Sequence, residues 1–411
     1  MKLSSTSTGA VKYLLAGAVL LEVLAQTYGF YWKLPIAASL VYFAAGLAVA
    51  LIPVWKDLSP GQATEASWIR IAGIGLFTLL AAWCLWRNVH LVAAAPLDYR
   101  QADMLPILET MAQRRLNGAA IYAPIEAIWA GMRPIYLPAM WLPFLPAVWL
   151  QLDIRWVSAL LLVAVMAIIV FGTGRQKGQV SIRLIAWLAL ILLYYYIFGL
   201  YNTLITLSEE PVVVFYYLLL AWALFRRWPV LTGLAIALCL LSRYSLVFWV
   251  PVYLVYQFFY RSRREAYTTA AALAGGLILL LTIGQAWDQL GFFLQLQESY
   301  LDELLDPDKS WSFIAQIGNN PGLIKFLPFS GIASWHRLLI IGSILIPPAA
   351  LWLFRKYRSG LQDRFFGLCS LKLCLVYFYN MLTIPYSYLF YPSTFLSLFI
   401  LFAAFSDKND A

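Results

Sequence analysis

Two aspartates stand five positions apart in the segment PLDYRQADMLPILETMAQRRLNG, residues 96–118. A carboxylate close to apolar surface can take a proton from a hydroxyl group, because desolvation raises its pKa toward the range that suits a general base. Asp98 and Asp103 are therefore candidates for acid–base chemistry. A structural role explains them equally well: Asp103 caps a helix that begins at Met104, and Asp98 is solvated.

The composition of the chain indicates the surroundings of this segment. Of its 411 residues, 62% are apolar and 12% are charged. Apolar runs of roughly 17 to 25 residues, long enough to cross a bilayer as helices, recur along the chain. These runs lack the alternating apolar and polar residues of β-barrel strands. The chain is therefore predicted to be an all-α, polytopic membrane protein with one transmembrane domain over residues 1–411. The net charge of +9 then reflects membrane topology and not nucleic-acid binding.

The apolar segments predict about twelve transmembrane helices. They lie near residues 11–30, 34–54, 69–87, 155–172, 183–200, 211–226, 229–241, 244–260, 267–287, 338–354, 364–381 and 388–405. With both termini in the cytoplasm, the loops on that side collect basic residues such as Arg226, Arg261 and Arg355, as the positive-inside rule requires. Two long loops, 88–154 and 288–337, then lie on the outer face.

The first outer loop contains two segments with helical patterns. Apolar side chains between residues 103 and 116 recur at a spacing that places them on one helix face. Residues 134–152 are apolar enough to span a membrane, but their four prolines and the arginine-rich loop that follows favour a helix at the outer interface. The sequence thus predicts two helices along the outer membrane surface.

Several stretches together resemble the polytopic glycosyltransferases of the GT-C superfamily, in particular its mannosyltransferase-like branch and the related members of the domain-of-unknown-function type. They are DYRQADMLP, RRLNGAAIYAP, RPIYLPAMWLPFLPA and SRYSLVFWVP within residues 96–260, with a weaker similarity at PYSYLFYP. The chain departs from the usual pattern because two spans precede the family's first helix and no soluble domain is appended.

The resemblance implies transfer of a sugar from a polyprenyl-phosphate donor to a lipid, glycan or protein acceptor on the outer face of the cell (inner) membrane. Asp103 best matches the family's acidic position and is the expected general base. Asp98 is the second choice, or it orients the acceptor or a Mg²⁺ or Mn²⁺ ion, which oxygen ligands suit. The sequence does not require a metal, since its four cysteines and two histidines form no metal-binding motif.

The lipid phosphate, as leaving group, needs positive charge beside it in the transition state. Arg243, between two spans on the outer side, is the first candidate, followed by Lys372 inside an apolar segment and Arg100 in the first outer loop. Arg243 has the alternative role of a snorkelling arginine at a helix end. Lys372 has the alternative role of an ion-pair partner for Glu22.

Substrate contacts are expected from charged or aromatic residues of the outer face: Glu209, Arg133, Tyr136 and Trp311. Glu209 and the loop around Trp311 have simpler explanations as well. Charge compensation at a helix N-terminus accounts for Glu209, and a solvated loop helix accounts for the acidic residues around Trp311.

A transporter or flippase of a lipid-linked saccharide is the alternative function, because it also needs many spans and a few intramembrane charges. Charge placement favours the enzyme, since the ionisable residues gather in an outer loop and the two halves of the chain show no repeat. In a third hypothesis, a noncatalytic assembly subunit, Asp103 is dispensable.

Overall fold

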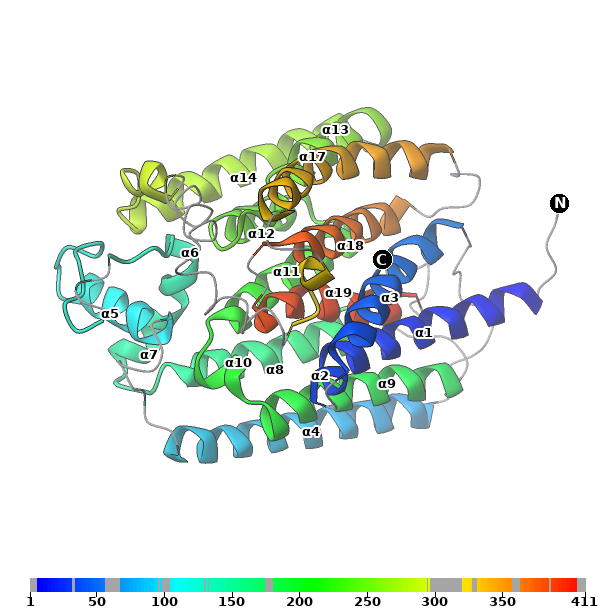
Figure 1. The fold of residues 1–411 in the computed structure, drawn as a ribbon, viewed down its shortest axis with the longest axis horizontal. Helices are drawn as coiled ribbons and strands as arrows, with labels where there is room; N and C mark the ends of the chain where they lie inside the picture. Colours follow the sequence, from blue (N-terminus) through cyan, green and yellow to red (C-terminus); the bar gives the residue numbers. More distant parts are fainter. Residues whose placement is uncertain are drawn as a thin grey trace.

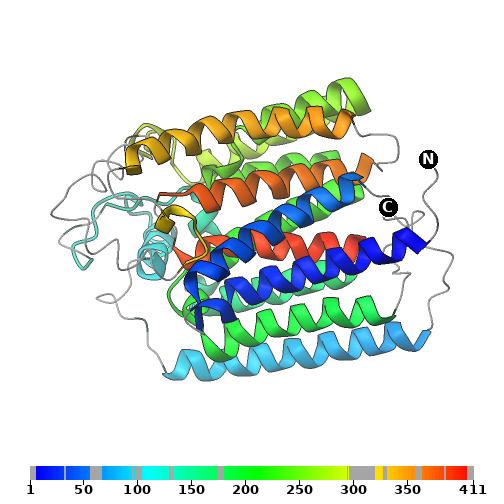
Figure 2. The same cartoon turned by 45° about the vertical axis from the view of Figure 1, so that its right-hand side comes forward.

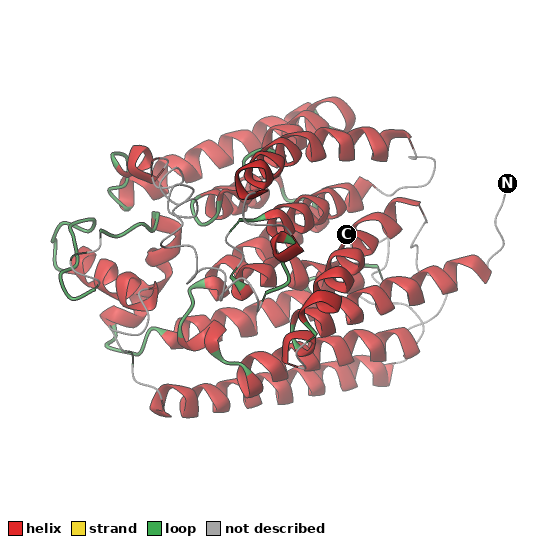
Figure 3. Ribbon diagram, viewed as in Figure 1, coloured by secondary structure: helices red, strands yellow, loops and turns green. Residues whose placement is uncertain are grey.

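The computed structural model shows a bundle of helices. It describes residues 6–31, 34–55, 67–94, 97, 104–128, 131, 133–173, 180–293, 295, 320–326, 331–356, 363–383 and 386–404. No strand occurs within these ranges, which confirms the all-α prediction. Figure 3 shows that the described loops gather mainly at one end of the bundle.

Each of the apolar segments predicted to span the membrane contains a helix. These helices are α1 (Thr6–Gln26), α3 (Pro35–Trp55), α4 (Ser67–Ala94), α8 (Arg155–Phe171), α9 (Val180–Tyr195), α11 (Glu210–Arg226), α12 (Pro229–Leu240), α13 (Trp249–Tyr256), α14 (Arg263–Ile283), α17 (Ile332–Lys356), α18 (Asp363–Met381) and α19 (Tyr391–Ala403).

Shorter elements connect or extend them. They are α2 (Tyr28–Tyr31), α5 (Met104–Leu116), α6 (Pro138–Trp141), η1 (Leu142–Phe144), α7 (Leu145–Trp149), η2 (Tyr196–Leu200), α10 (Thr203–Thr206), η3 (Tyr244–Leu246), η4 (Gln257–Arg261), η5 (Ile324–Phe326) and η7 (Ser387–Phe390). Among them, η2 continues α9, and η3 and η4 flank α13.

Five stretches of the described chain are long and apolar enough to cross a membrane. They are Pro35–Pro53, Arg70–Ala94, Val180–Leu200, Arg263–Ile283 and Ile332–Lys356. Shorter apolar helices accompany them at Arg155–Phe171, Pro229–Leu240, Phe365–Met381 and Ser387–Ala403. This pattern is compatible with a polytopic membrane protein.

The long helices run alternately in opposite directions along the bundle (Figures 1 and 2). One end carries α5, α6 and α7, on the left in Figure 1, and is called the loop end below. The start of α1 and the end of α19 lie at the opposite end. Consecutive spans of a polytopic protein would have this antiparallel order.

Two long helices extend further than the sequence predicts. Helix α4 continues through Arg87 and Asn88 to Ala94, so the first loop begins after residue 94 and not at residue 88. The polar run does not end the helix because Nε of Arg87 donates to the carbonyl of Phe198 and Asn88 is fully buried. Helix α17 begins at Ile332, which shortens the second loop in the same way.

A glycine in α12 allows an unusually close approach to α14. A Cβ atom on Gly233 would lie 2.3 Å from the carbonyl oxygen of Thr269, whereas a Cβ on Gly275 of α14 would meet no atom within 4 Å. Small residues let helix backbones approach in this manner in membrane proteins.

We therefore expect Gly233→Ala to lower the stability of the bundle by about 1–3 kcal/mol, because the added methyl group overlaps backbone atoms of α14. Gly275→Ala is the matched control, and it should be neutral or slightly stabilising because alanine favours helices. Thermal unfolding of the two purified variants in detergent checks this. Equal melting temperatures would contradict the close-packed interface.

Candidate functional site

Helix α5 begins at Met104, the residue directly after Asp103. The apolar side chains of Leu105, Leu108 and Met111 are completely buried. The helix packs against α6, η1 and α7. The predicted helix is thus confirmed, but protein covers the face that was expected to lie on the membrane, because the proline-rich segment offers the nearer apolar surface.

The proline-rich segment is helical in three short pieces, α6, η1 and α7, each with a proline in its first turn, where a missing N–H is tolerated. The hydroxyl of Tyr216 in α11 donates to the carbonyl of Ala139 at 2.7 Å, and α6 contacts α14, so the segment is fixed to the bundle. Its far end presents exposed apolar side chains that suit a membrane interface: Trp149, Leu150 and Leu152.

Four of the predicted site residues lie outside the described residues: Asp98, Arg100, Asp103 and Trp311. Their roles stay predictions. The structure describes the helix that follows Asp103 and the elements around it.

Arg243 is the centre of a buried ion cluster at the loop end. Its Nη2 donates to Oε1 of Glu209 and to Oε2 of Glu210, each at 2.7 Å. The side chain of Arg243 is 20% exposed, whereas those of Glu209 and Glu210 are 2% and 0% exposed. The fold therefore joins two residues, Arg243 and Glu209, that the sequence suggested for separate roles.

The turns that carry this cluster explain its position. Glu209 and Glu210 stand at the start of α11, where Ser208 Oγ accepts the amide hydrogen of Glu210. Acidic residues are stabilised at such a helix start by the helix dipole. Arg243 follows α12 in an extended conformation directly before η3. Sequence reasoning missed Glu210 as a third member, although two adjacent glutamates before an apolar helix are a visible signal.

The cluster carries a net charge of −1 when all its groups are ionised. Oε2 of Glu209, Oε1 of Glu210 and Nε of Arg243 are buried and have no hydrogen-bond partner among the described residues. Buried polar atoms are rarely left unpaired in proteins, because desolvation without a hydrogen bond is costly. The cluster is thus a place where a polar ligand group or water would be stabilised.

Buried hydroxyl groups lie beside the cluster. The hydroxyl of Tyr217 and Oγ of Ser245 are 2.5 Å apart. Tyr379 is 1% exposed, lies close enough to Arg243 and Glu210 to interact electrostatically, and has its hydroxyl near those of Tyr217 and Ser245. Together these groups form a polar region inside an otherwise apolar bundle.

Arg133 links the first loop to the segment after α14. Its Nη2 donates to Oε1 of Gln289 at 2.8 Å, and its guanidinium lies 4.2 Å from the ring centre of Phe292. The arginine is exposed. Tyr136, three residues later, is buried. Arg133 therefore remains accessible to a polar ligand, whereas Tyr136 is part of the packing around α6.

Lys372 forms a fully buried ion pair away from these loops. Its Nζ is 2.5 Å from Oε1 of Glu22, and both side chains are 0% exposed. Nζ also donates to Oγ and the carbonyl of Ser393, and Ser397 donates to the other oxygen of Glu22. The pairing with Glu22 that the sequence suggested is present, and it favours a structural role over phosphate binding.

Two further basic residues near the loop end were not singled out from the sequence. Arg155 at the start of α8 makes two hydrogen bonds to Asp153, with Nε to Oδ1 at 2.8 Å and Nη2 to Oδ2 at 2.5 Å. The Asp-x-Arg spacing at a helix start is the signal for this pair. Burial lowers the pKa of Lys325 to about 8, and its Nζ donates to the carbonyl of Asn320. No motif in the sequence indicates this lysine.

No protein-family model, curated protein or solved structure matches the chain. In the part of the chain that the structure describes, no group of three or more His, Cys, Asp or Glu side chains is placed to hold a metal ion. A cation bound to Asp98 and Asp103 would lie outside that part.

The described residues combine three chemical elements at one end of the bundle: the short amphipathic helix α5, a guanidinium held by two carboxylates, and a set of buried hydroxyl groups. A carboxylate can accept a proton, and the guanidinium of Arg243, whose charge the two glutamates balance, has its Nε as a hydrogen-bond donor for a ligand.

Proposed function

We propose that this protein is an integral membrane glycosyltransferase of the GT-C type. It transfers a sugar from a polyprenyl-phosphate donor to an acceptor hydroxyl on the outer face of the cell membrane. Asp103 acts as general base, Asp98 supports the acceptor, and Arg243 stabilises the phosphate that leaves. Twelve helices span the membrane with both termini in the cytoplasm.

The charge distribution supports this orientation. The end of the bundle opposite the loop end carries many described basic residues, namely Arg70, Arg183, Arg226, Arg227, Arg261, Arg263, Arg264, Arg355 and Lys356. Glu265 is the acidic side chain described at that end, and it pairs with Arg261 at 2.7 Å. Basic residues mark the cytoplasmic side of membrane proteins, so the loop end faces outward in this proposal.

The observation that carries the proposal is the position of the Arg243 cluster. The cluster lies at the loop end, the same end as α5, whose first residue follows Asp103. An enzyme that joins a lipid-borne donor to a polar acceptor needs a base and a phosphate-binding group at one membrane surface. Helix α5 is held at that end because it packs against α6 and α7, and α6 in turn contacts α14.

The direct test uses the purified protein and a panel of polyprenyl-phosphate sugars. We expect one donor to be consumed, with release of polyprenyl phosphate and slow hydrolysis when no acceptor is present. Neither hydrolysis nor transfer with any donor of the panel, while the protein remains folded, would contradict the proposal.

Topology gives an independent prediction. Ala119→Cys, next to α5, should react with a membrane-impermeant maleimide from the outer side of intact cells, and Arg264→Cys should react only after the membrane is opened. Both positions are exposed, and the natural cysteines are buried. The reverse labelling pattern would place the loop end in the cytoplasm and would contradict an active site on the outer face.

A lipid-linked saccharide transporter remains the second candidate, because the Glu22–Lys372 pair lies deep among α1, α18 and α19. Ionisable residues in mid-membrane often mark a transport path. However, serine hydroxyl groups complete the hydrogen bonds of this pair, which is typical of a closed structural contact. Donor uptake into vesicles without chemical change would support the transporter instead.

A further inference from the structure

Arginine side chains gather around η4, at the end of the bundle opposite the loop end. In the described part of the chain, no carboxylate forms an ion pair with four exposed members of this group: Arg227, Arg263, Arg264 and Arg355. Glu265, the acidic side chain described beside them, is taken up by Nε of Arg261 at 2.7 Å. The region around η4 therefore carries positive charge that the described carboxylates do not balance.

Two of these arginines are held against aromatic rings of η4. The guanidinium of Arg355 lies 5.4 Å from the ring centre of Tyr260, and its Nη1 donates to the Tyr260 hydroxyl at 3.2 Å. The guanidinium of Arg263 lies 5.2 Å from the ring centre of Phe258. Such contacts orient a guanidinium and leave its charge in place. Since arginine has five N–H donors, both side chains keep donors for an anion.

Phe259 stands between these two aromatic residues in the sequence and is itself exposed. Its exposed fraction is 68%, and Tyr267 of α14, which packs edge-on against Phe258 with ring centres 5.8 Å apart, is 65% exposed. Exposed aromatic rings beside arginines are typical of the boundary between hydrocarbon and lipid headgroups. Helix α14, long and apolar enough to cross a membrane, begins at Arg263, so these rings lie near its first turns.

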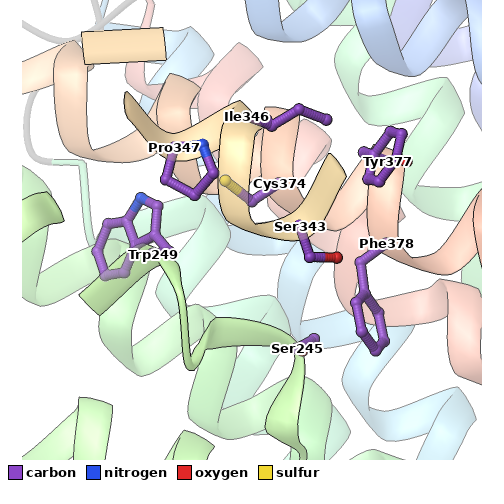
Figure 4. Close-up of a pocket in the computed structure, with 8 residues that line it drawn as sticks. All are labelled: Ser245, Trp249, Ser343, Ile346, Pro347, Cys374, Tyr377 and Phe378. Carbon is purple, nitrogen blue, oxygen red and sulfur yellow. The ribbon is translucent and has the colours of Figure 1, made fainter. Parts of the chain in front are cut away.

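The elements that carry these residues are neighbours in the bundle. The π-helical turn η4 continues α13 and contacts α14, and α13 contacts α17. Trp249 at the start of α13 and Pro347 of α17 line the same small pocket (Figure 4), so the two helices are also packed together away from η4. Single π-helical turns often occur at functional sites.

We propose that the surface formed by Phe258, Phe259, Tyr260, Arg263 and Arg355, called the η4 surface below, binds the headgroup of an anionic phospholipid. The phosphate accepts hydrogen bonds from the two arginines, because a guanidinium matches phosphate oxygens with several donors. The acyl chains lie against the exposed ring of Phe259. This inference is independent of the proposed function, since it involves neither a sugar donor nor an acceptor.

The surroundings of the two arginines favour a lipid over a soluble anion. A soluble anion would gain only from exposed guanidinium groups, whose attraction water and salt weaken. A phospholipid also removes apolar surface of Phe259 from water, and a leaflet rich in anionic lipids attracts basic residues at the ends of spans. Charge and apolar contact thus act together only for a lipid.

Native mass spectrometry of the purified full-length protein tests this inference with two lipids that have the same acyl chains. Dioleoyl phosphatidylglycerol is anionic, and dioleoyl phosphatidylcholine is zwitterionic. We expect the anionic lipid to bind at least about tenfold more tightly, because two arginines face its uncompensated phosphate. Equal affinities of the two lipids would overturn the proposal.

A matched pair of variants locates the binding site. Arg355→Gln should weaken binding of phosphatidylglycerol about fivefold, the effect of losing one basic residue at a membrane surface. Arg70→Gln is the control, because Arg70 is an exposed arginine at the same end of the bundle, in α4, far from η4 in Figures 1 and 2. The control should bind as the natural protein does. Equal losses in the two variants would contradict the η4 surface.

Two further arms separate the phosphate contact from the chain contact. Phe259→Ala should weaken both lipids alike, about threefold, because it removes apolar surface that they share. Unchanged binding of both lipids would contradict the place assigned to the acyl chains. Glycerol 3-phosphate, which has the phosphate without the chains, should displace phosphatidylglycerol only at roughly 100-fold higher concentration. Displacement at equal concentration would replace the lipid by a soluble anion.

Stability measurements keep these outcomes distinct from misfolding. Arg355 and Phe259 are exposed, so the variants without added lipid should melt at the temperature of the natural protein. Added phosphatidylglycerol should raise the melting temperature of the natural protein, because a ligand of the folded state stabilises it, and should raise that of Arg355→Gln less. The same rise in both proteins would contradict the role of Arg355.

Discussion

Replacing Asp103 by asparagine is expected to lower sugar transfer by about 10²- to 10⁴-fold, the usual contribution of a positioned acid or base. Asparagine has nearly the same shape as aspartate, but it cannot accept the proton of the acceptor hydroxyl. The measurement is kcat with the purified protein and a polyprenyl-phosphate sugar.

This substitution also separates the two roles that the sequence left open for Asp103. Helix α5 begins at the next residue, and asparagine caps a helix about as well as aspartate does. Asp103→Asn should therefore melt at the same temperature as the natural protein. Asp103→Ala should lose activity and in addition about 1 kcal/mol of stability through the missing cap.

Glu126 offers the matched control, since it is an exposed carboxylate of the same loop, and Glu126→Gln should retain full transfer. If purified Asp103→Asn also transfers sugar at the natural rate, Asp103 is not the base. A corresponding loss in Asp98→Asn would then move the assignment to Asp98.

The second large effect is expected at the buried ion pair. Lys372→Met keeps the length of the side chain but removes the cation, and Glu22 is left charged among α1, α18 and α19. Breaking a buried pair in this way typically costs about 3–5 kcal/mol. Thermal unfolding in detergent, together with the yield of folded protein, measures the loss.

The double variant Glu22→Gln, Lys372→Met tests whether the effect belongs to the pair. It should recover most of the stability, because no unpaired charge remains, and the difference from the single variants gives the coupling energy. Full transfer activity in the double variant would show that Lys372 is structural. A folded double variant that no longer binds the donor would restore Lys372 to the phosphate site.

Much of the fold follows from local properties of the sequence. Apolar runs of membrane length form helices because backbone groups in lipid must be bonded within the segment, and every segment predicted on this basis contains a helix. The start of α5 at Met104 could be predicted because a candidate capping residue, Asp103, directly precedes a run of apolar residues at helical spacing. Helix ends were predicted less well, since Arg87 donates to the carbonyl of Phe198 and Asn88 is buried within the bundle.

The candidate site depends on contacts between residues that are distant in the chain, and these only the tertiary structure decides. Arg243 meets Glu209 and Glu210 because the turns before α11 and after α12 lie at the same end of the bundle. A small pocket forms where the η3–α13 segment, α17 and α18 pack together, and a single sequence records no such packing. The sequence by itself determines which segments are helical and which polar residues stand between them. The tertiary structure decides which of those residues meet, because that depends on the order in which the helices pack.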